Sequence, residues 1–344
     1  TTVININNKN KGENMDNIKK IGLTALAGSL VAVSAANAGA LSVSGGAKFG
    51  YAASDGNEDL ETDGNRFGMQ KLISFSGTGE LDNGNTISLT HNMAVTGSLS
   101  TSVLKYDMGD MGSLTYAEDS GDVGIGKIDD LMPTAEEEVT NGIDADTASG
   151  ANEALVGKVD GGMTGFNYVY TMDMATIQLG YSPKTTSGNN DDGSNSGAGG
   201  KKSSTSIAIT ATPMDGLTVF GGTGDKGTGT QEDDHDTYGL KYAFGPITVG
   251  YQHSEIDFAA TTSNDLETDM FGVSFQVNDD LSISYGEQDT EAETSSVEQE
   301  VSGMSVAYSM GSISIAAHAN EGKNIANQTA NESTHTEISI NFAF

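Results

Sequence analysis

Carboxylates dominate the side chains that could do chemistry in this chain, and they are densest between residues 118 and 161. This stretch holds twelve Asp and Glu residues, with Lys127 and Lys158 as its basic side chains. Carboxylates in this number attract cations, because a space lined by one sign of charge concentrates counterions. The six acids that we single out as the candidate cation-attracting set are Asp119, Asp122, Asp129, Asp130, Glu136 and Glu137.

Two patterns suggest metal chemistry but do not specify a site. Asp55, Asn57 and Asp59 begin like a calcium-binding loop, but Leu60 stands where such a loop needs glycine. Other acid-rich segments also offer oxygen ligands, but the spacing of these ligands does not specify a metal site. No pair among the five histidines has the sequence spacing of a zinc site. We therefore expect no metal centre and no cofactor beyond loosely bound Ca²⁺.

Catalytic motifs point to no enzyme. The segment GTGDKG (222–227) has the glycine spacing of a dinucleotide-binding turn, but such a turn must open a helix, and TGTQEDDHD follows instead. The chain has no GxSxG elbow. It also has no cysteine, which excludes thiolate ligands, thiol nucleophiles and disulfides. We expect no catalytic residues.

The net charge of −32 excludes one class of partner. A surface this acidic repels phosphates, so the sequence argues against nucleic-acid binding. Cations are favoured instead, as counterions, ligands or permeating solutes.

The first segment has the pattern of an export signal. From Met15, two lysines precede an uncharged apolar run over 21–35, and a small-x-small motif ends at Ala38. The run is shorter than the about 20 residues of a membrane-spanning helix. We expect cleavage after Ala38. The predicted division is an upstream extension plus signal peptide over 1–38 and an exported domain over 39–344.

Short strands of alternating polarity must position the acids. In NTISLTHNMAV, Ile87, Leu89 and Met93 lie on one face, with Thr, Ser and Asn on the other. The last residues, EISINFAF, alternate in the same way. We count about sixteen such runs of about 8–13 residues, and a strand needs about 9–11 residues to cross a bilayer.

The joints between these strands alternate in length. Short joints are expected at 82–85, 108–112, 172–174, 213–216, 244–246, 278–280 and 310–311. Long polar joints are expected at 53–65, 118–161, 183–202, 225–236, 255–268, 287–300 and 319–334, with a short joint near 96–98 as the exception. Short turns at one end and long loops at the other are typical of a transmembrane barrel, and a soluble sandwich has no reason to sort its loops this way.

Polarity supports the same fold. Only 36% of residues are hydrophobic, and the polar face of each strand is rich in Ser, Thr, Asn and Gly. A closed barrel in lipid carries its apolar residues outside and a wet interior inside. We therefore predict an all-β, antiparallel up-and-down transmembrane barrel. Strand parity turns Lys48, Arg66 and Lys241 toward the interior, whereas Lys71 shares its parity with the outward Ile73.

Four segments resemble the Gram-negative general porins, most nearly those of alphaproteobacteria. They are GALSVSGGAKFGY (39–51), ISFSGTGELDNGNTISLTHNM (73–93), MGSLTYAEDSGDVG (111–124) and ISINFAF (338–344). The resemblance implies a homotrimer in the outer membrane and a third loop, 118–161, folded into the pore as its constriction. It also implies that the last strand, with Ile340, Phe342 and Phe344, is the signal read by the barrel-assembly machinery.

The same resemblance implies that acids of the third loop face basic side chains on the opposite wall. Arg66 is the only arginine in the sequence, which departs from the arginine-rich wall of better-known members. Within the loop, PTAEEE (133–138) predicts the start of a short helix, with Thr134 as its cap and Glu137 closing a capping box.

These observations predict a passive diffusion channel for small hydrophilic solutes and ions, selective for cations. Size would be set by the loop constriction and ion preference by the charges of the lining. Two alternatives remain open. One is a solute-specific porin for a neutral or cationic nutrient. The other is a surface protein whose acidic loops serve adhesion, with the barrel as its anchor in outer-membrane lipid.

Overall fold

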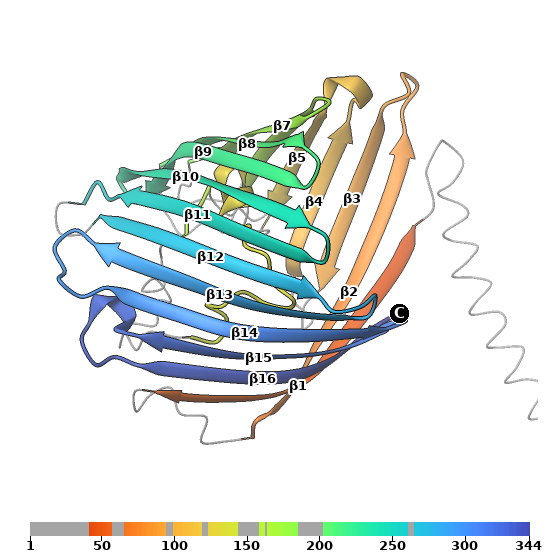
Figure 1. Ribbon diagram of the computed structural model, residues 1–344. Coiled ribbons are helices and arrows are strands. Elements are labelled where there is room, and N and C mark those ends of the chain that lie inside the picture. The colour runs from red at the N-terminus through yellow and green to blue at the C-terminus, as the bar shows by residue number, and fades with distance from the viewer. Residues whose placement is uncertain are drawn as a thin grey trace, which may run out of the picture.

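The computed structural model describes residues 41–56, 65–93, 99–118, 123–143, 158–161, 164–184, 202–260 and 265–344. Within them, sixteen strands form one antiparallel sheet that closes on itself (Figure 1). Each strand pairs with its neighbours along the chain, and β1 pairs with β16. The predicted all-β, up-and-down barrel is confirmed. The predicted leader over 1–38 lies outside the described residues.

The strand bounds are as follows. The first eight are β1 Ser42–Gly56, β2 Phe67–Glu80, β3 Thr86–Met93, β4 Leu99–Asp107, β5 Ser113–Glu118, β6 Gly165–Thr171, β7 Ala175–Ser182 and β8 Ser204–Met214. The others are β9 Leu217–Thr228, β10 Gln231–Phe244, β11 Ile247–Asp257, β12 Leu266–Gln276, β13 Leu281–Ala292, β14 Gln299–Met310, β15 Ile313–Lys323 and β16 Ser333–Ala343. Short 3₁₀ turns are η1 Gly109–Met111, η2 Gly124–Ile128 and η4 Ile325–Asn327. Throughout these ranges no helix combines the length and apolar character needed to cross a membrane.

The alternation of joint lengths holds, with one correction. Short turns close one end of the barrel, and longer joints gather at the other (Figure 1). The expected long joint over 225–236 is wrong, because β9 continues to Thr228 and β10 begins at Gln231. Gly229, with φ of +54°, supplies the left-handed conformation of this tight turn. The acids that suggested a loop lie on extended strands instead.

The two faces of the sheet have opposite polarity. Val43, Phe67 and Met304 point outward and are 60%, 56% and 63% exposed. On the inner face, Gln252 and Ser339 are fully buried. A soluble sandwich would bury its large apolar side chains, so this arrangement suits a barrel whose outer surface contacts lipid.

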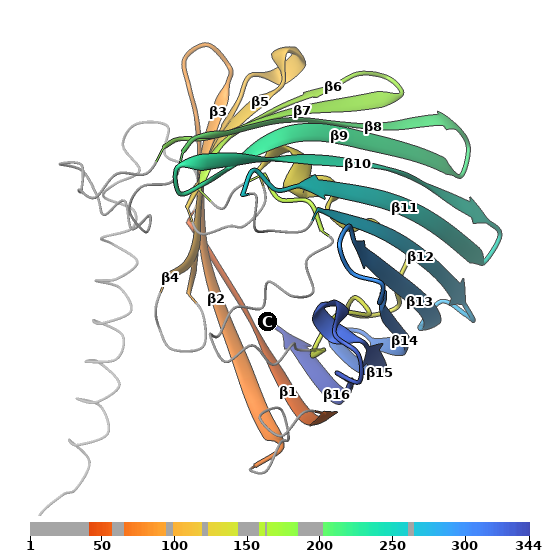
Figure 2. The same cartoon turned by 90° about the vertical axis from the view of Figure 1, so that its left-hand side faces the viewer.

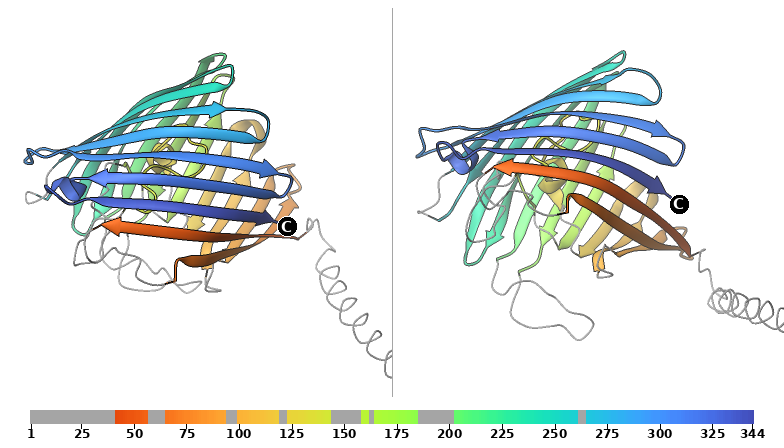
Figure 3. Two further views of the ribbon diagram at one scale, coloured as in Figure 1. Left: turned by 60° about the horizontal axis from the view of Figure 1, so that its bottom comes forward. Right: turned by 90° about the horizontal axis from the view of Figure 1, so that it is seen from below.

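β1 and β16 close the barrel edge to edge (Figure 3). Their last pair is reciprocal: Gly45 N donates to Phe344 O at 2.8 Å, and Phe344 N donates to Gly45 O at 3.0 Å. A Cβ atom on Gly45 would come 2.9 Å from Cε2 of Phe344, so the aromatic ring lies against this glycine. The seam thus combines backbone pairing with an outward aromatic contact.

The direction of Lys71, which strand parity left open, is settled by the register. Lys71 pairs with Ala47 in an uninterrupted β1–β2 ladder, so no register slip occurs. The side chain therefore lies on the outer face, on the same side as Phe49 and Ile73. Lys105 lies on the inner face opposite Thr115, and its Nζ is 3.1 Å from Asp107 Oδ2.

Candidate functional site

Residues 123–143, here called the inner segment, run inside the barrel along its wall (Figure 2). The segment begins where Gly124 N donates to Asn167 Oδ1 of β6 and Ile125 N donates to Ser206 Oγ of β8, each at 3.0 Å. It ends against β15 and β16, where Asn320 Nδ2 donates to Asn141 O at 2.9 Å. The inner segment therefore covers the lumen side of the wall from β6 to β16.

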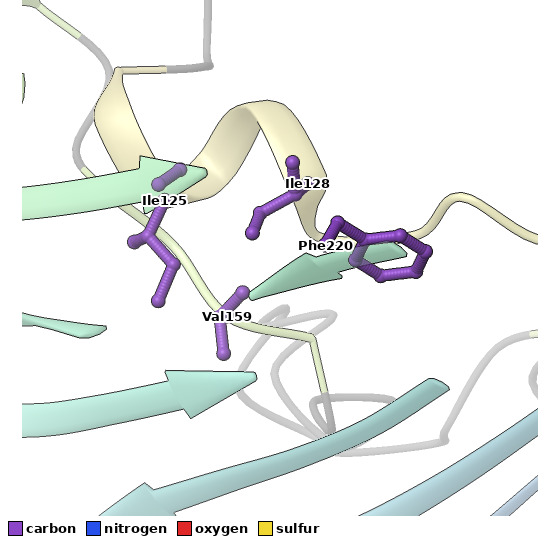
Figure 4. Close-up of a cluster of buried hydrophobic side chains, with 5 residues drawn as sticks. Ile125, Ile128, Val159 and Phe220 are labelled. Carbon is purple, nitrogen blue, oxygen red and sulfur yellow. The ribbon is translucent and has the colours of Figure 1, made fainter. Parts of the chain in front are cut away.

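An apolar cluster anchors the start of the inner segment (Figure 4). Ile125 and Ile128 of η2 pack with Val159 against Ala208 and Phe220 of the wall, and both isoleucines are at most 1% exposed. Full burial of one such side chain contributes about 1.5–3 kcal/mol. A second apolar cluster, in which Ile143 packs with Val301 and Ile325, lies at the other end of the segment, so apolar contacts place both ends on the wall.

Gln252 of β11 holds the next stretch through its amide. Its Nε2 donates to the carbonyls of Ile128 and Asp129 at 2.9 and 2.8 Å. Its Oε1 accepts from Leu131 N at 3.0 Å. Gln252 is completely buried, so water cannot reach this contact. Its amide therefore supplies the hydrogen-bond partners of backbone groups that would otherwise have none.

Glycines on neighbouring strands make room for the segment. A Cβ atom on Gly250 or Gly272 would come 2.7 or 2.9 Å from Cδ of Pro133. On β13, a Cβ atom on Gly286 would come 2.8 Å from Val139 Cγ1. The absence of side chains at these positions lets the backbone of the inner segment lie directly on the sheet.

The predicted helix at 133–138 is wrong. Thr134 Oγ1 donates to Glu137 O at 3.0 Å and accepts from Glu136 N at 3.3 Å, so the residue expected as a cap stabilises only a local turn. Wall serines accept from the backbone of this turn: Ala135 N donates to Ser284 Oγ at 2.9 Å and Glu136 N to Ser305 Oγ at 3.2 Å. These bonds hold the stretch as a turn against the wall.

Four of the six candidate acids lie on the inner segment. Asp119 and Asp122 fall outside the described residues. Asp129 accepts from Asp130 N at 2.9 Å. Asp130 is paired with Lys158, with Oδ2 and Nζ 3.1 Å apart. Burial lowers the pKa of Lys158, but the charges of Asp130 and Glu138 outweigh it and leave this pKa above its ordinary value.

Glu136 and Glu137 meet Lys48 of β1 directly. Lys48 Nζ lies 2.5 Å from Glu137 Oε1, 2.7 Å from Glu337 Oε1 and 3.7 Å from Glu136 Oε1. Acid and base are therefore in contact rather than separated across the lumen. Three carboxylates share one ammonium, which leaves an excess of negative charge at this point of the wall.

His318 completes the surroundings of Glu136. His318 Nδ1 lies 2.7 Å from Glu136 Oε2. Burial raises the pKa of Glu136, but the hydrogen bond of His318, the charge of His318 when it is protonated and the charge of Lys48 outweigh it and leave this pKa below its ordinary value. Glu136 is accordingly a carboxylate at neutral pH.

The other two predicted bases lie apart from this cluster. Arg66 immediately precedes the first residue of β2, and its Nη1 donates to Tyr51 OH at 3.0 Å. Arg66 and Lys48 line one open cavity of about 410 Å³. Lys241 lies on the lumen face of β10 opposite Gly250. At the candidate calcium loop, Asp55 pairs with Thr334 of β16, while Asn57 and Asp59 fall outside the described residues.

Sequence reasoning did not single out His318, His335 and Glu337 as a group. His318 pairs with Glu337 across β15–β16, and His335 lies two residues before Glu337 on the same face. No local motif joins residues that meet only through strand pairing. The sequence indicates only that these three side chains face the lumen. Predicting that they meet also requires the register of β15 against β16.

Comparison with known proteins gives one family and one fold. The profile of the family described as Gram-negative porin matches residues 22–344. No curated protein sequence matches the chain significantly. Among solved structures, the chain is similar to an anion-selective porin from Comamonas acidovorans, with 13% identity, 89% of this chain and 99% of that chain covered, and a TM-score of 0.63.

Two further structures share the fold. One is a loop L8 deletion mutant of OmpT, an outer membrane protein of Vibrio cholerae, with 14% identity, 90% of this chain and 100% of that chain covered, and a TM-score of 0.62. The other is a mutant of the Rh. blastica porin, with 14% identity, 89% and 100% coverage and a TM-score of 0.61. At these identities the likeness shows the barrel architecture.

Proposed function

The chain belongs to the Gram-negative porin family and is a channel protein of the outer membrane, and from this premise we propose that it is a passive diffusion channel for small hydrophilic solutes and ions with a preference for cations. The observation that carries the proposal is the inner segment lying on the lumen wall from β6 to β16. A segment in this place narrows the passage, and the polar wall around it offers hydrogen bonds to hydrated solutes.

The charge of the lining supports cation preference. Glu136, Glu137 and Glu337 share Lys48, so the wall beside the inner segment carries net negative charge. A charge in a narrow passage acts at short range, within the Debye length of about 8 Å at physiological salt. Permeating cations are attracted there, and anions are repelled.

Carboxylates at the long-loop end add to this potential. On the outer faces of β9 to β15, acids sit on neighbouring strands and often directly opposite one another: Asp225, Asp234, Asp236, Glu255, Asp257, Glu267, Asp269, Glu287, Asp289, Glu291, Glu300 and Glu321. They raise the local concentration of cations near the mouth. Their influence on selectivity is weaker than that of the inner acids, because water and salt screen exposed charges.

The fold alone does not fix the sign of the selectivity. The similar porin from Comamonas acidovorans is described as anion-selective, although its barrel superposes on this one. Side chains of the lining therefore decide the preference, and in this chain the described lining around Lys48 is acidic.

The proposal includes a homotrimer, which the family resemblance implies, and lipid around the outward apolar side chains. It also includes recognition of the last strand, with Ile340, Phe342 and Phe344, by the barrel-assembly machinery. The outward direction of Phe342 and Phe344, which are 41% and 79% exposed, supports such a role because a receptor can reach them.

Liposome swelling tests the channel proposal. The refolded barrel is reconstituted in vesicles, and swelling is followed in isosmotic sugars of increasing size, with protein-free vesicles as control. Swelling that slows smoothly with sugar size supports a general diffusion channel. Swelling with one solute only would favour a solute-specific porin. No swelling from a verified, inserted barrel would contradict the proposal and favour a barrel-anchored surface protein.

A further inference from the structure

We propose that His318, His335 and Glu337 form a binding site for a divalent transition-metal ion, with Zn²⁺ as the representative ion, in the barrel wall behind the inner segment. This function is separate from diffusion through the lumen, because the site lies between the barrel wall and the inner segment. Among the described residues, their ligand atoms lie within 4.8 Å of one another.

Strand pairing sets the geometry of the site. His318 of β15 pairs with Glu337 of β16, and Asn320 pairs with His335, so the histidines are diagonal neighbours on the lumen face. Their rings are stacked, with centroids 5.3 Å apart and an interplanar angle of 27°. Ligand atoms of a tetrahedral zinc ion lie about 3.4 Å apart, given metal–ligand distances of about 2.0–2.1 Å. Side-chain rotation has to bring the ligand atoms from within 4.8 Å of one another to this spacing when the ion binds.

An unsatisfied nitrogen points to a ligand. His318 is 1% exposed at its side chain, and its Nε2 is buried without a hydrogen-bond partner among the described residues. A buried polar atom left in this state costs about 1–3 kcal/mol. A metal ion at the cluster would use this lone pair, and His335 and Glu337 lie beside it.

Glu136 prepares His318 for coordination. Its carboxylate can only accept a hydrogen bond, so the proton of the neutral imidazole lies on Nδ1, which is 2.7 Å from Glu136 Oε2. The Nε2 atom then presents its lone pair. This is the carboxylate–histidine–metal arrangement, in which the outer carboxylate orients the ring and raises its basicity. Glu136 is a positioning residue in this proposal.

Charge and enclosure fit a dication. Glu136, Glu137 and Glu337 surround one cationic side chain, Lys48, so two negative charges remain uncompensated when the histidines are neutral. The inner segment covers the site: a Cβ atom on Gly142 would come 2.2 Å from Cγ of His335, so this glycine lies on the imidazole ring. Contact with the segment excludes bulk water from that side.

The donor set selects the kind of metal. Two imidazoles and one carboxylate, with a fourth position for water, suit Zn²⁺, and imidazole also suits Cu²⁺ and Ni²⁺. Ca²⁺ prefers a shell of oxygen atoms. The carboxylates of Glu136, Glu137 and Glu337 also lie close together, but Lys48 pairs with all three of them, whereas in the histidine group it pairs with Glu337 alone, so we assign the ion to the histidine side.

Zinc titration in excess Ca²⁺ tests the site, because Ca²⁺ occupies the oxygen-only positions of the acidic surface. The refolded full barrel is titrated with ZnCl₂ by calorimetry, and bound zinc is measured after desalting. We expect a single tight Zn²⁺ per chain, lost in both His318→Gln and His335→Gln. Glu136→Gln should weaken binding by about 10–100-fold, as for other carboxylates behind a ligating histidine.

His253→Gln is the matched control. His253 also contacts a carboxylate, with Nδ1 2.9 Å from Asp269 Oδ1, but it lies on the outer face. This variant should bind zinc like the wild type. Equal uptake by wild type and His318→Gln, or no uptake by the wild type, would overturn the proposal.

Cobalt provides a readout that needs no variant. Should His318→Gln fail to refold, the visible spectrum of Co²⁺ bound to the wild-type barrel decides. Intense bands of tetrahedral nitrogen and oxygen ligation support the site. The weak spectrum of octahedral oxygen ligation would overturn it.

Discussion

Pro133 lies directly on Gly272: a Cβ atom on this glycine would come 2.9 Å from Cδ of the proline and 3.1 Å from its carbonyl oxygen. Gly272→Ala should therefore displace the inner segment. We expect a loss of about 1–3 kcal/mol in the free energy of unfolding, as for other overpacked contacts, and a changed single-channel conductance. Urea unfolding and planar-bilayer recordings measure the two effects.

Gly68→Ala is the matched control for this change. Gly68 is also a lumen-side strand glycine, but a Cβ atom there would meet nothing within 4 Å. Its conductance and stability should stay close to those of the wild type. Equal effects of the two alanines would contradict the contact between Pro133 and Gly272.

Lys48 moderates the negative charge of the lining, so its removal should strengthen cation preference. In Lys48→Gln, Glu136, Glu137 and Glu337 lose their shared ammonium. We expect the K⁺/Cl⁻ permeability ratio to rise about two- to fivefold, since a unit charge at about 4 Å in water is worth about 1 kcal/mol.

The exposed Lys202 supplies the control. Its Nζ lies 3.3 Å from Glu232 Oε2, and both side chains are more than 40% exposed. Lys202→Gln should leave the ratio nearly unchanged. An unchanged ratio in Lys48→Gln would show that these acids do not reach the permeating ions.

Glu298, in the joint between β13 and β14, gives the stability of the barrel a pH dependence. Burial raises its pKa above 4.5, and the negative charges of Glu291, Glu300 and Asp269 raise it further. A carboxyl with a raised folded-state pKa contributes stability below its unfolded pKa and loses it as the pH rises through the folded pKa. Ionised Glu298 is therefore destabilising at pH 7.

Glu298→Gln should stabilise the barrel at pH 7 by less than about 1 kcal/mol, because the group is exposed. Thermal unfolding followed at several pH values measures the gain. It should fade as the pH falls toward 4.5, and it should shrink in 1 M salt, which screens the repulsion. A gain that persists unchanged in acid would exclude charge repulsion as its cause.

Phe344 should matter more for assembly in cells than for folding in detergent. Its backbone bonds to Gly45 do not depend on the side chain, so Phe344→Ala keeps both of them. We expect several-fold less heat-modifiable barrel in the outer membrane but a similar refolding yield in vitro. An equal loss in both assays would make the ring a seam contact rather than an assembly signal.

The fold was predictable because each strand pattern and each turn length can be recognised from a short stretch of consecutive residues. NTISLTHNMAV marks β3, which spans Thr86–Met93, and the short joints fell at the observed turns. The two errors have a common cause. The acidic stretch 225–236 and the segment 133–138 take their conformations from neighbouring strands and from wall serines, which no local propensity contains.

The site was predictable only in part. Strand parity predicts Lys48, Arg66 and Lys241 on the lumen face, because parity needs only the strand itself. Lys48 meets the inner segment there, whereas Arg66 donates to Tyr51, which shares its face with Phe67. Parity did not predict that Lys48 would pair with Glu137 of the inner segment, or that His318 would meet His335. The first contact depends on the path of the inner segment along the wall and the second on the register of β15 against β16, and neither is encoded in a short motif.

The reversal potential of the reconstituted barrel across a potassium chloride gradient tests the central claim most directly. The refolded protein is inserted in a planar bilayer, and the zero-current potential is read at moderate salt, where the inner charges are incompletely screened. A potential of the sign set by K⁺ permeation, with conductance steps in groups of three, is the predicted result. An anion-selective or zero potential would contradict control of permeation by the acids around Lys48.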